Sequence, residues 1–321
     1  MKNFNSKGCF LSAIFLIASL PLTLVHSKGR YFEIGDSRKI YMECKGKGSP
    51  VVLLLAGYPM RGDFAWNTPM PGGSPLTVYS GVSKFTKVCI YDRPGTLIVK
   101  GEDFAMSRST PVKQPVNVID QTSDLERLIR AANLPGPYIF VAHSASGLIA
   151  RMYAFSHSKD LAGLILLDVT TEDLKDKWTR KEWTVFDYSI NVLTDEELYK
   201  HKEFEWIDFD LSFYLMQKSL GKGKQRIKLK IPHTTVITAD KKPKVEQLIK
   251  SKLWPSWTNQ KLADDVMQKI AKAQDELAQS FEPAAKHIKN PDSSHNIPVE
   301  QPQLVIDEIQ ALVNQSRSKN E

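Results

Sequence analysis

Five short, largely apolar runs constrain the fold of this chain more than any other feature of its sequence. Each is five or six residues long, which suits a strand and is too short for a buried helix. They occupy residues 51–56 (VVLLLA), 87–91 (KVCIY), 138–143 (YIFVAH), 162–167 (AGLILL) and 234–238 (TTVIT). Strands that are apolar on both faces belong to parallel sheets covered by helices on both sides.

Helical patterns separate these runs. Apolar residues recur at helical spacing in residues 116–134, 145–155, 262–277 and 304–313,. Strands that alternate with helices predict the α/β class, with a mostly parallel, doubly wound sheet and right-handed crossovers. Residues 30–44 add two short strands, and Gly35-Asp36 predicts a hairpin between them,.

One stretch between two predicted strands is far longer than a crossover helix. It is charged and rich in aromatic residues, and we interpret residues 170–231 as an inserted helical cap. Its last part, residues 218–230, is basic and contains no acid, which is typical of a solvated linker,. The predicted domains are a signal peptide at 1–27, an α/β core at 28–169, the cap at 170–231 and the rest of the core at 232–321.

The N-terminus has the pattern of a secretory signal peptide. Lys2 and Lys7 precede an apolar run that ends at Val25-His26-Ser27, where small or apolar residues suit an export peptidase,. We expect an exported protein, periplasmic or secreted, with no stable membrane span after cleavage. The alternative is a retained anchor, for which the run is short and interrupted by Ser12, Ser19 and Pro21,.

Charge and metal-ligand spacing exclude several function classes. Cleavage of the signal would lower the formal net charge from +7 to +5, which is too mild to indicate a nucleic-acid partner,. No CxxC, HExxH or clustered His/Cys spacing occurs, so we expect no metal and no cofactor,.

A serine stands between a buried strand and an amphipathic helix. In YIFVAHSASGLIARMYA, the strand ends at His143, Ser144 follows, and the helix begins almost at once. Such a turn presents the serine, in a strained conformation, at the end of the sheet. The positions two before and two after the serine must be small, and they hold Ala142 and Ser146 where glycines are usual.

Several segments resemble the α/β-hydrolase superfamily, in particular its serine esterase and aminopeptidase-like members. They are LLLAGYP, YDRPG, GPYIFVAHSASGLIARMYA, GLILLD and SSHNIPVEQPQLVIDEI. The resemblance covers nearly all of the mature chain except the cap. It implies an α/β-hydrolase fold in which Ser144 is the nucleophile, activated by a histidine and an acid.

His295 is the base that the resemblance implies, because SSHNI resembles the histidine loop before the final helix. From the residues alone, a histidine in a polar loop is more often part of the plain surface. His143 lies beside the serine, but we expect it to face away, since neighbours on a strand point to opposite sides.

Two aspartates compete for the role of the acid. Asp168 follows the run at 162–167, and Asp240 follows the run at 234–238. We favour Asp168, which matches the register of some family members, and keep Asp240 as the alternative. The more usual position in the family corresponds to Lys242 here.

The implied mechanism is acyl transfer. Backbone N–H groups of Tyr58 and Ala145 are expected to form the oxyanion hole, and His295 to activate first Ser144 and then water. The predicted partner is a small-molecule substrate with an acyl group. The alternatives are a catalytically silent binding protein and a halide-handling relative; the latter would require Asp in place of Ser144.

The resemblance also bears on two cysteines. In the fold that it implies, the strands of Cys44 and Cys89 are antiparallel neighbours, and both cysteines are expected toward the end of the sheet opposite Ser144. If the register matches, their Cα atoms would be roughly 4.5–5.5 Å apart and could carry a disulfide. The alternative is a pair of buried free thiols.

Overall fold

The computed structural model describes residues 29–100, 103–174, 176–190, 202–241, 244–250, 256–290 and 292–318. The predicted signal peptide therefore lies outside the described residues, as does Lys242. Within the described ranges, no helix is both long enough and apolar enough to cross a membrane.

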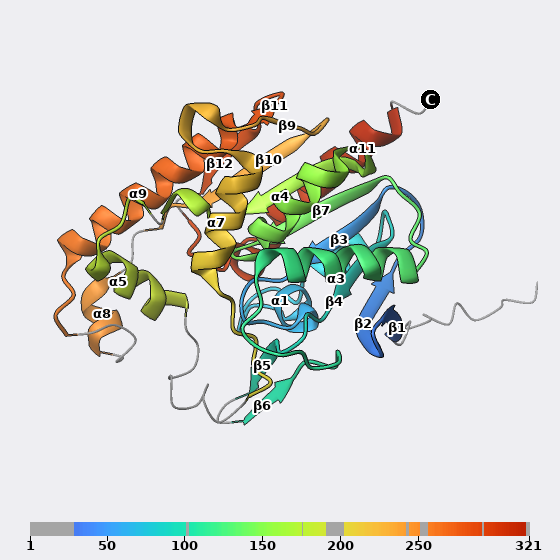
Figure 1. Ribbon diagram of the computed structural model, residues 1–321, viewed down its shortest axis with the longest axis horizontal. Helices are drawn as coiled ribbons and strands as arrows, with labels where there is room; N and C mark the ends of the chain where they lie inside the picture. Colours follow the sequence, from blue (N-terminus) through green and yellow to red (C-terminus); the bar gives the residue numbers. More distant parts are fainter. Residues whose placement is uncertain are drawn as a thin grey trace, which may run out of the picture.

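An eight-stranded sheet forms the centre of the described structure (Figure 1). Its strands, in spatial order, are β1 (Arg30–Gly35), β2 (Arg38–Lys45), β4 (Val88–Tyr91), β3 (Val51–Leu55), β7 (Tyr138–His143), β8 (Leu161–Leu167), β10 (Thr234–Ala239) and β12 (Lys286–Asn290). The six from β4 to β12 are parallel, while β2 is antiparallel to both of its neighbours. Every residue of β3, β4, β7, β8 and β10 is buried, as their apolar sequences predict.

Helices cover both faces of this sheet, so the predicted doubly wound α/β architecture is correct. One face packs against α3 (Val118–Ala131), α4 (Ser146–His157) and α7 (Phe209–Leu220). The other packs against α1 (Gly62–Asn67), α2 (Val78–Val82), α10 (Ile297–Glu300) and α11 (Pro302–Ser318). Of these seven, α3, α4 and α11 were predicted as helices, α7 was assigned only to the cap in general, and the short α1, α2 and α10 were not predicted.

A small hairpin outside the main sheet was also missed. Strands β5 (Leu97–Lys100) and β6 (Asp103–Met106) form a separate two-stranded antiparallel sheet. Each has only four residues, too few for a periodic pattern to be distinguished from a loop.

The predicted cap region contains η2 (Glu172–Leu174), α5 (Arg180–Ile190), α7, η3 (Gly223–Gln225) and β9 (Leu229–Lys230). Its apolar residues pack against α8 (Val245–Lys250) and the long helix α9 (Gln260–Gln279). Strand β9 pairs with β11 (Phe281–Glu282). The insertion therefore shares its core with residues that follow it in sequence, and α9 links it to the sheet.

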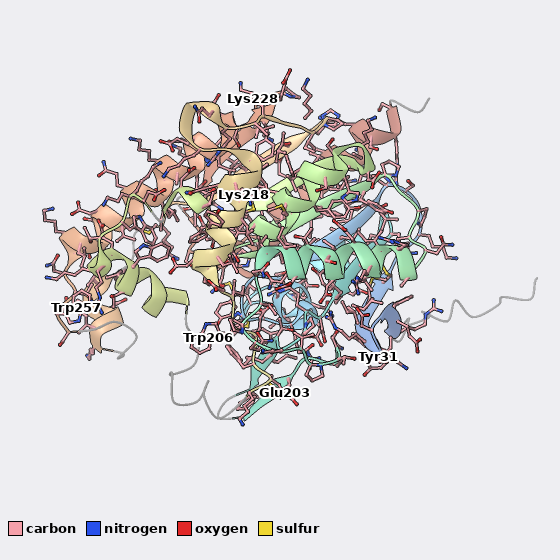
Figure 2. The ribbon with its side chains drawn as sticks, in the orientation of Figure 1. Tyr31, Glu203, Trp206, Lys218, Lys228 and Trp257 are labelled. Carbon is pink, nitrogen blue, oxygen red and sulfur yellow. A yellow bond between two sulfur atoms is a disulfide. The ribbon has the colours of Figure 1, made fainter. Side chains whose placement is uncertain are left out.

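The basic run at 218–230 was predicted to be a solvated linker, but only part of it is exposed to solvent. Lys218 and Lys228 are exposed (Figure 2), but Arg226 is 10% exposed and forms ion pairs with Glu172 and Asp173. The acids that balance this run lie some fifty residues earlier in the chain, so they could not be seen in the run itself.

Cys44 and Cys89 form a disulfide. The two residues face each other directly across the antiparallel pair β2–β4, and their Cα atoms are 4.1 Å apart, somewhat closer than predicted. The bridge lies at the level of Leu53, the middle residue of β3, four residues before the level of Ser144.

Candidate active site

Ser144 occupies the turn between β7 and α4 in a left-handed backbone conformation. Its φ is 56°, which costs a non-glycine residue about 1–3 kcal/mol and must be imposed by its surroundings,. Neighbouring segments do this: the Ser144 N–H donates to the Leu167 carbonyl (3.1 Å), and the Ser144 carbonyl accepts from the N–H groups of Gly147 (3.0 Å) and Thr170 (3.1 Å). Strand β8 and its extension therefore hold the turn closed.

The residues in place of the usual glycines are accommodated. Ser146 is buried, accepts from the His143 N–H (3.0 Å), and its hydroxyl lies 2.8 Å from the carbonyls of both Leu55 and His143, to one of which it donates. The glycine that strand–helix packing needs is one position later, because a Cβ on Gly147 would lie 2.4 Å from the Val169 side chain. Ser146 thus ties the turn to β3 instead of disrupting it.

Strand register aligns three of the relevant positions at one edge of the sheet. His143 pairs with Leu167, so Ser144 and Asp168 both lie one residue beyond the same level. Leu55 pairs with Ala142, which places Gly57 level with Ser144 on the other side. Asp168 resembles Ser144 in its backbone as well, with a φ of 43°.

Asp168 and His295 are in direct contact. Oδ2 of Asp168 lies 2.6 Å from Nδ1 of His295, and its other oxygen accepts from the Ala239 N–H (3.2 Å). The side chain of Asp168 is largely buried, with 12% of its surface exposed, while the side chain of His295 is 39% exposed. A carboxylate on Nδ1 leaves Nε2 of the imidazole free to accept a proton, which is the tautomer that a general base needs.

The loop that carries His295 is anchored on both sides. Glu300, in α10, accepts hydrogen bonds from the N–H and the hydroxyl of Ser294. On the other side, Ser293 is fully buried and its carbonyl accepts from the Lys241 N–H, just beyond β10 (3.2 Å). The position of His295 is therefore fixed by the end of the sheet and by the helix that follows the loop.

Asp240 does not take part in this arrangement. Its N–H donates to the Asn290 carbonyl (2.9 Å), and the residue is exposed. Of the two candidate acids, the structure brings only Asp168 to His295.

His143 lies beside His295, contrary to the prediction that it faces away. Its Nε2 is 2.7 Å from the His295 carbonyl, and the two rings have centroids 4.7 Å apart. Because a carbonyl only accepts, Nε2 carries the proton. Burial, reinforced by the proximity of His295, lowers the pKa of His143 to about 3, so this ring stays neutral. Strand alternation failed as a guide here because the chain leaves the strand at this residue.

No hydrogen bond joins the Ser144 hydroxyl to His295 among the residues that the structure describes. Bonds between a nucleophile and its base are often long in unliganded enzymes and shorten when substrate binds. What the structure brings together is a serine in the strained turn, an aspartate at the same level and a histidine on that aspartate.

The expected oxyanion donors lie on either side of Ser144. Ala145 precedes the first turn of α4, where N–H groups have no partner within the helix,. Tyr58 follows Gly57, and a Cβ on Gly57 would lie 3.0 Å from both the Ser144 Cβ and the His143 Nδ1. Only glycine allows the loop at 56–58 to approach Ser144 this closely.

Arg93, in the YDRPG segment, holds this loop from behind. Its guanidinium donates to the carbonyls of Ala56 (2.5 Å) and Gly57 (3.1 Å) and forms a paired contact with Glu205 (2.6 and 2.9 Å). Arg93 and Glu205 are both almost completely buried. Burial opposes the charge on Arg93, but Glu205 more than offsets it, and the pKa of Arg93 is raised. The resemblance of the YDRPG segment gave Arg93 no role, and nothing in the sequence singles out Glu205.

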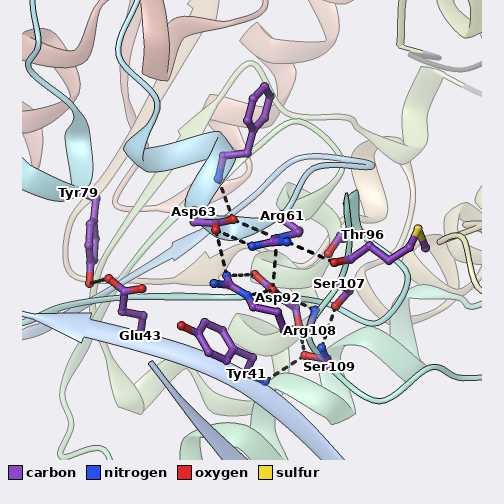
Figure 3. A network of polar contacts seen from close by, with 12 residues as sticks. Tyr41, Glu43, Arg61, Asp63, Tyr79, Asp92, Thr96, Ser107, Arg108 and Ser109 are labelled. Carbon is purple, nitrogen blue, oxygen red and sulfur yellow. Dashed lines mark hydrogen bonds and ion pairs between the residues drawn. The ribbon is translucent and has the colours of Figure 1, made fainter. Parts of the chain in front are cut away.

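A second ionic network supports the continuation of the same loop (Figure 3). Asp92 is fully buried and accepts two hydrogen bonds from Arg108 (2.6 and 2.9 Å), while Arg61 lies 3.6 Å away and pairs with Asp63 (2.6 Å). The Arg108 guanidinium also stacks over the ring of Tyr41 at 3.6 Å. The buried charges of Asp92 and Arg93 thus hold the loop at 56–61 against the neighbouring segments.

Among the described residues, no group of three or more His, Cys, Asp or Glu side chains is arranged to hold a metal ion. The chemistry available at this edge of the sheet is that of serine, imidazole, carboxylate and backbone N–H groups.

Comparison with known proteins gives partial sequence matches. No family model matches the chain. It is 27% identical over 162 residues to a probable transporter, efuK, of Hormonema carpetanum, covering 47% of this chain and 20% of that protein. It is 25% identical over 178 residues to the uncharacterized protein YbdG of Bacillus subtilis, covering 50% and 47%. The chain thus matches less than half the length of these curated relatives.

Solved structures match far more of the chain. An esterase from Thermogutta terrifontis has a TM-score of 0.53 at 16% identity, covering 90% of this chain and 99% of that one. A putative lipase from Acinetobacter baumannii has a TM-score of 0.53 at 18% identity, covering 92% and 93%. A putative epoxide hydrolase from Pseudomonas aeruginosa has a TM-score of 0.56 at 13% identity, covering 92% and 98%. At these identities the likeness concerns the fold.

Proposed function

Because the chain has the α/β-hydrolase fold, as predicted, we propose that it is a serine hydrolase that cleaves ester- or amide-like bonds through an acyl-enzyme on Ser144. The fold hosts several chemistries, so the proposal rests on the site and not on the fold. The halide-handling alternative would require an aspartate in place of Ser144, and the comparison structures include an esterase and a putative lipase.

The observation that carries the proposal is the pair formed by Asp168 and His295. Their 2.6 Å contact lies at the same sheet edge as Ser144, whose left-handed backbone projects from the end of β7. Two non-glycine residues, Ser144 and Asp168, are held in this costly conformation at neighbouring strand ends. Strain of this kind concentrates at functional sites.

The proposed reaction begins with attack of the Ser144 oxygen on the substrate carbonyl, while His295 Nε2 accepts the serine proton. The Asp168 carboxylate orients the ring and stabilises the imidazolium that forms. The imidazolium then donates its proton to the departing alcohol or amine, leaving an acyl group on Ser144. Water, deprotonated by the same Nε2, attacks this ester and releases the acid.

Backbone N–H groups of Ala145 and Tyr58 stabilise the negative oxygen of each tetrahedral intermediate. Each such donor lowers the activation barrier by about 3–4 kcal/mol in well-studied hydrolases, because it is in place before the negative charge develops. The usual histidine of the oxyanion loop is Ala56 here, which does not remove a backbone donor.

The residues around Tyr58 favour an apolar acyl or alcohol group. Its ring makes edge contacts with Phe204 and Phe209, with centroids 6.0 and 6.1 Å apart, and both phenylalanines come from the predicted cap region. Val116 and Ile207 pack with Ala145 in an adjoining apolar cluster. We propose small molecules with an apolar acyl group as substrates.

We further propose that the protein works outside the cytoplasm, in the periplasm or after secretion. The predicted signal peptide motivates this, and a disulfide between Cys44 and Cys89 would persist in an oxidising compartment,. N-terminal sequencing of the exported protein tests the idea: a mature chain that starts near Lys28 is expected, and a cytoplasmic protein that still begins at Met1 would contradict it.

The experiment that tests the proposed activity is a screen of p-nitrophenyl esters of increasing chain length, beside aminoacyl anilides, with purified mature protein. We expect ester or anilide cleavage that a fluorophosphonate abolishes. A silent binding protein would cleave none of them and would not react with the fluorophosphonate.

A further inference from the structure

We propose that Arg93 and Glu205 together form a positioning device for the oxyanion hole, through which the cap region holds the Tyr58 N–H in its catalytic orientation. This inference rests on the proposed serine-hydrolase function. It assigns a role in the reaction to a glutamate that lies 61 residues after Ser144 in the sequence and contacts neither the serine nor His295.

The geometry of one peptide unit links Arg93 to the oxyanion hole. The Gly57 carbonyl and the Tyr58 N–H belong to the same peptide, and in a trans peptide these two groups point in opposite directions. Arg93 draws the Gly57 carbonyl toward itself with a 3.1 Å hydrogen bond, and the Met60 N–H binds the same oxygen at 3.0 Å. The Tyr58 N–H consequently points away from Arg93.

Arg93 also restrains the preceding peptide, through the 2.5 Å bond to the Ala56 carbonyl. Two consecutive carbonyls on one planar guanidinium fix the loop more firmly than either bond alone, because the fork leaves little freedom to rotate. A lysine could not reproduce this pattern, since one ammonium group cannot reach both carbonyls and the carboxylate in the same geometry.

Glu205 fixes the guanidinium from the opposite side. It receives two hydrogen bonds from Arg93 and a third from Gln121 Nε2 (2.9 Å). The segment around Glu205 is itself tightly held: its N–H donates to the Gly95 carbonyl (2.9 Å), and a Cβ on Gly95 would lie 2.4 Å from the Glu205 nitrogen.

The same segment touches the rest of the site. Phe204, directly before Glu205, packs its ring against Tyr58, and the Trp206 carbonyl accepts from the Val116 N–H (2.8 Å). The cap therefore contacts the oxyanion loop twice, through an aromatic ring on the Tyr58 side chain and through an ion pair behind the Tyr58 peptide.

The molecule offers a matched control in a second buried ion pair. Arg151 is 1% exposed and donates to the carbonyls of Gly147 (3.2 Å) and Thr170 (3.4 Å) and to the carboxylate of Glu172 (2.6 and 3.1 Å). It has the same burial and the same kinds of partner as Arg93, but it binds no carbonyl of the oxyanion loop.

The test compares Arg93→Lys and Glu205→Gln with Arg151→Lys, using the best ester from the substrate screen and a trifluoromethyl ketone analogue of it. We expect Arg93→Lys to lower kcat about a hundredfold and Glu205→Gln about tenfold, because a misplaced donor loses much of its value. KM should change less than threefold, and the inhibition constant of the ketone should rise in parallel with the loss of kcat.

Arg151→Lys should lower the thermal midpoint about as much as Arg93→Lys, yet keep kcat and the affinity for the ketone within threefold of wild type. Arg93→Lys keeps the charge balance with Glu205, so it decides the question if Glu205→Gln does not fold.

Folded Arg93→Lys protein with wild-type kcat and ketone affinity would overturn the proposal, as would equal losses in Arg93→Lys and Arg151→Lys. A wild-type protein that cleaves nothing and resists a fluorophosphonate would instead refute the serine-hydrolase function itself.

Discussion

Strands β8 and β10 lie side by side, run in the same direction and are each followed by an aspartate, yet only Asp168 contacts His295. The difference is one of length. Leu167, the last residue of β8, pairs with Ile237, and β10 continues for two more residues. Asp240 therefore lies about 6.6 Å farther along the strand direction than Asp168, at a rise of about 3.3 Å per residue.

Strand register sets how far along the sheet edge each aspartate lies, and this position distinguishes the roles of two chemically identical side chains. Asp168 is level with Ser144 on β7. Beyond that level, the backbone of Asp240 binds the carbonyl of Asn290 at the end of β12, where it helps to hold the loop that carries His295. Asp168 contacts the imidazole of His295, whereas the backbone of Asp240 helps to hold the loop that carries His295.

The largest loss of activity is expected from changes at Ser144 and His295, the two residues relative to which Asp168 and Asp240 are compared. Ser144→Ala and His295→Ala should each lower kcat by about a million-fold, since the members of such a triad act as a unit. Ester hydrolysis by protein purified free of host esterases provides the measurement, with circular dichroism as the control for folding. Near-wild-type turnover in either variant would remove the basis for comparing the two aspartates.

The comparison itself is tested by Asp168→Asn beside Asp240→Asn. An amide at Asp168 would present the wrong groups to Nδ1 and favour the wrong tautomer, so we expect kcat to fall by about 10³–10⁴. Asp240→Asn keeps its backbone bond to Asn290 and should stay within twofold of wild type. The reverse order of severity would assign the acid to β10.

A smaller effect, on stability, is expected from His143, which lies beside the ring of His295. Because its pKa in the fold is about 3, His143 binds a proton more readily in the unfolded chain, so the folded state loses stability as pH falls below about 6.5,. His143→Gln keeps a donor for the His295 carbonyl but does not titrate. Between pH 6.5 and 4.5 the wild type should lose about 2 kcal/mol more unfolding free energy than this variant.

Urea denaturation at a series of pH values measures this difference, and His295 and Asp168 are common to both proteins. Parallel stability curves for wild type and His143→Gln would mean that His143 is not the neutral, buried partner described above.

The smallest effect on activity is expected at the disulfide, which lies well away from Ser144 along the strands. Replacing Cys44 and Cys89 together by alanine opens a loop of 45 residues, which should cost about 4 kcal/mol of stability on a chain-entropy basis,. The kcat should be unchanged, because Cys89 lies four residues before the level of Ser144, about 13 Å away along the strands,. A large loss of kcat in the folded double variant would contradict this separation between the bridge and the site.

The fold was largely predictable because its central strands are apolar on both faces and leave no other assignment open. Ser144 followed from the strand and helix around it, whereas Asp168 was preferred to Asp240 only because it matches the register of some members of the superfamily that the chain resembles. His143 was misassigned, because the alternation that holds within β7 ends where Ser144 turns to a φ of 56°. Glu205 could not be found, since its partner Arg93 is 112 residues away and only the folded chain brings them together.

The central claim is that Ser144 is the nucleophile of an acyl-transfer site. Reaction with a fluorophosphonate, followed by intact-mass measurement and peptide mapping, tests it most directly. Ser146→Ala serves as the control, because Ser146 lies two residues from Ser144 and falls on the same proteolytic peptide. We expect one adduct per chain on Ser144, formed by wild type and Ser146→Ala and absent in Ser144→Ala. An unmodified wild type, or an adduct that persists in Ser144→Ala, would contradict the account.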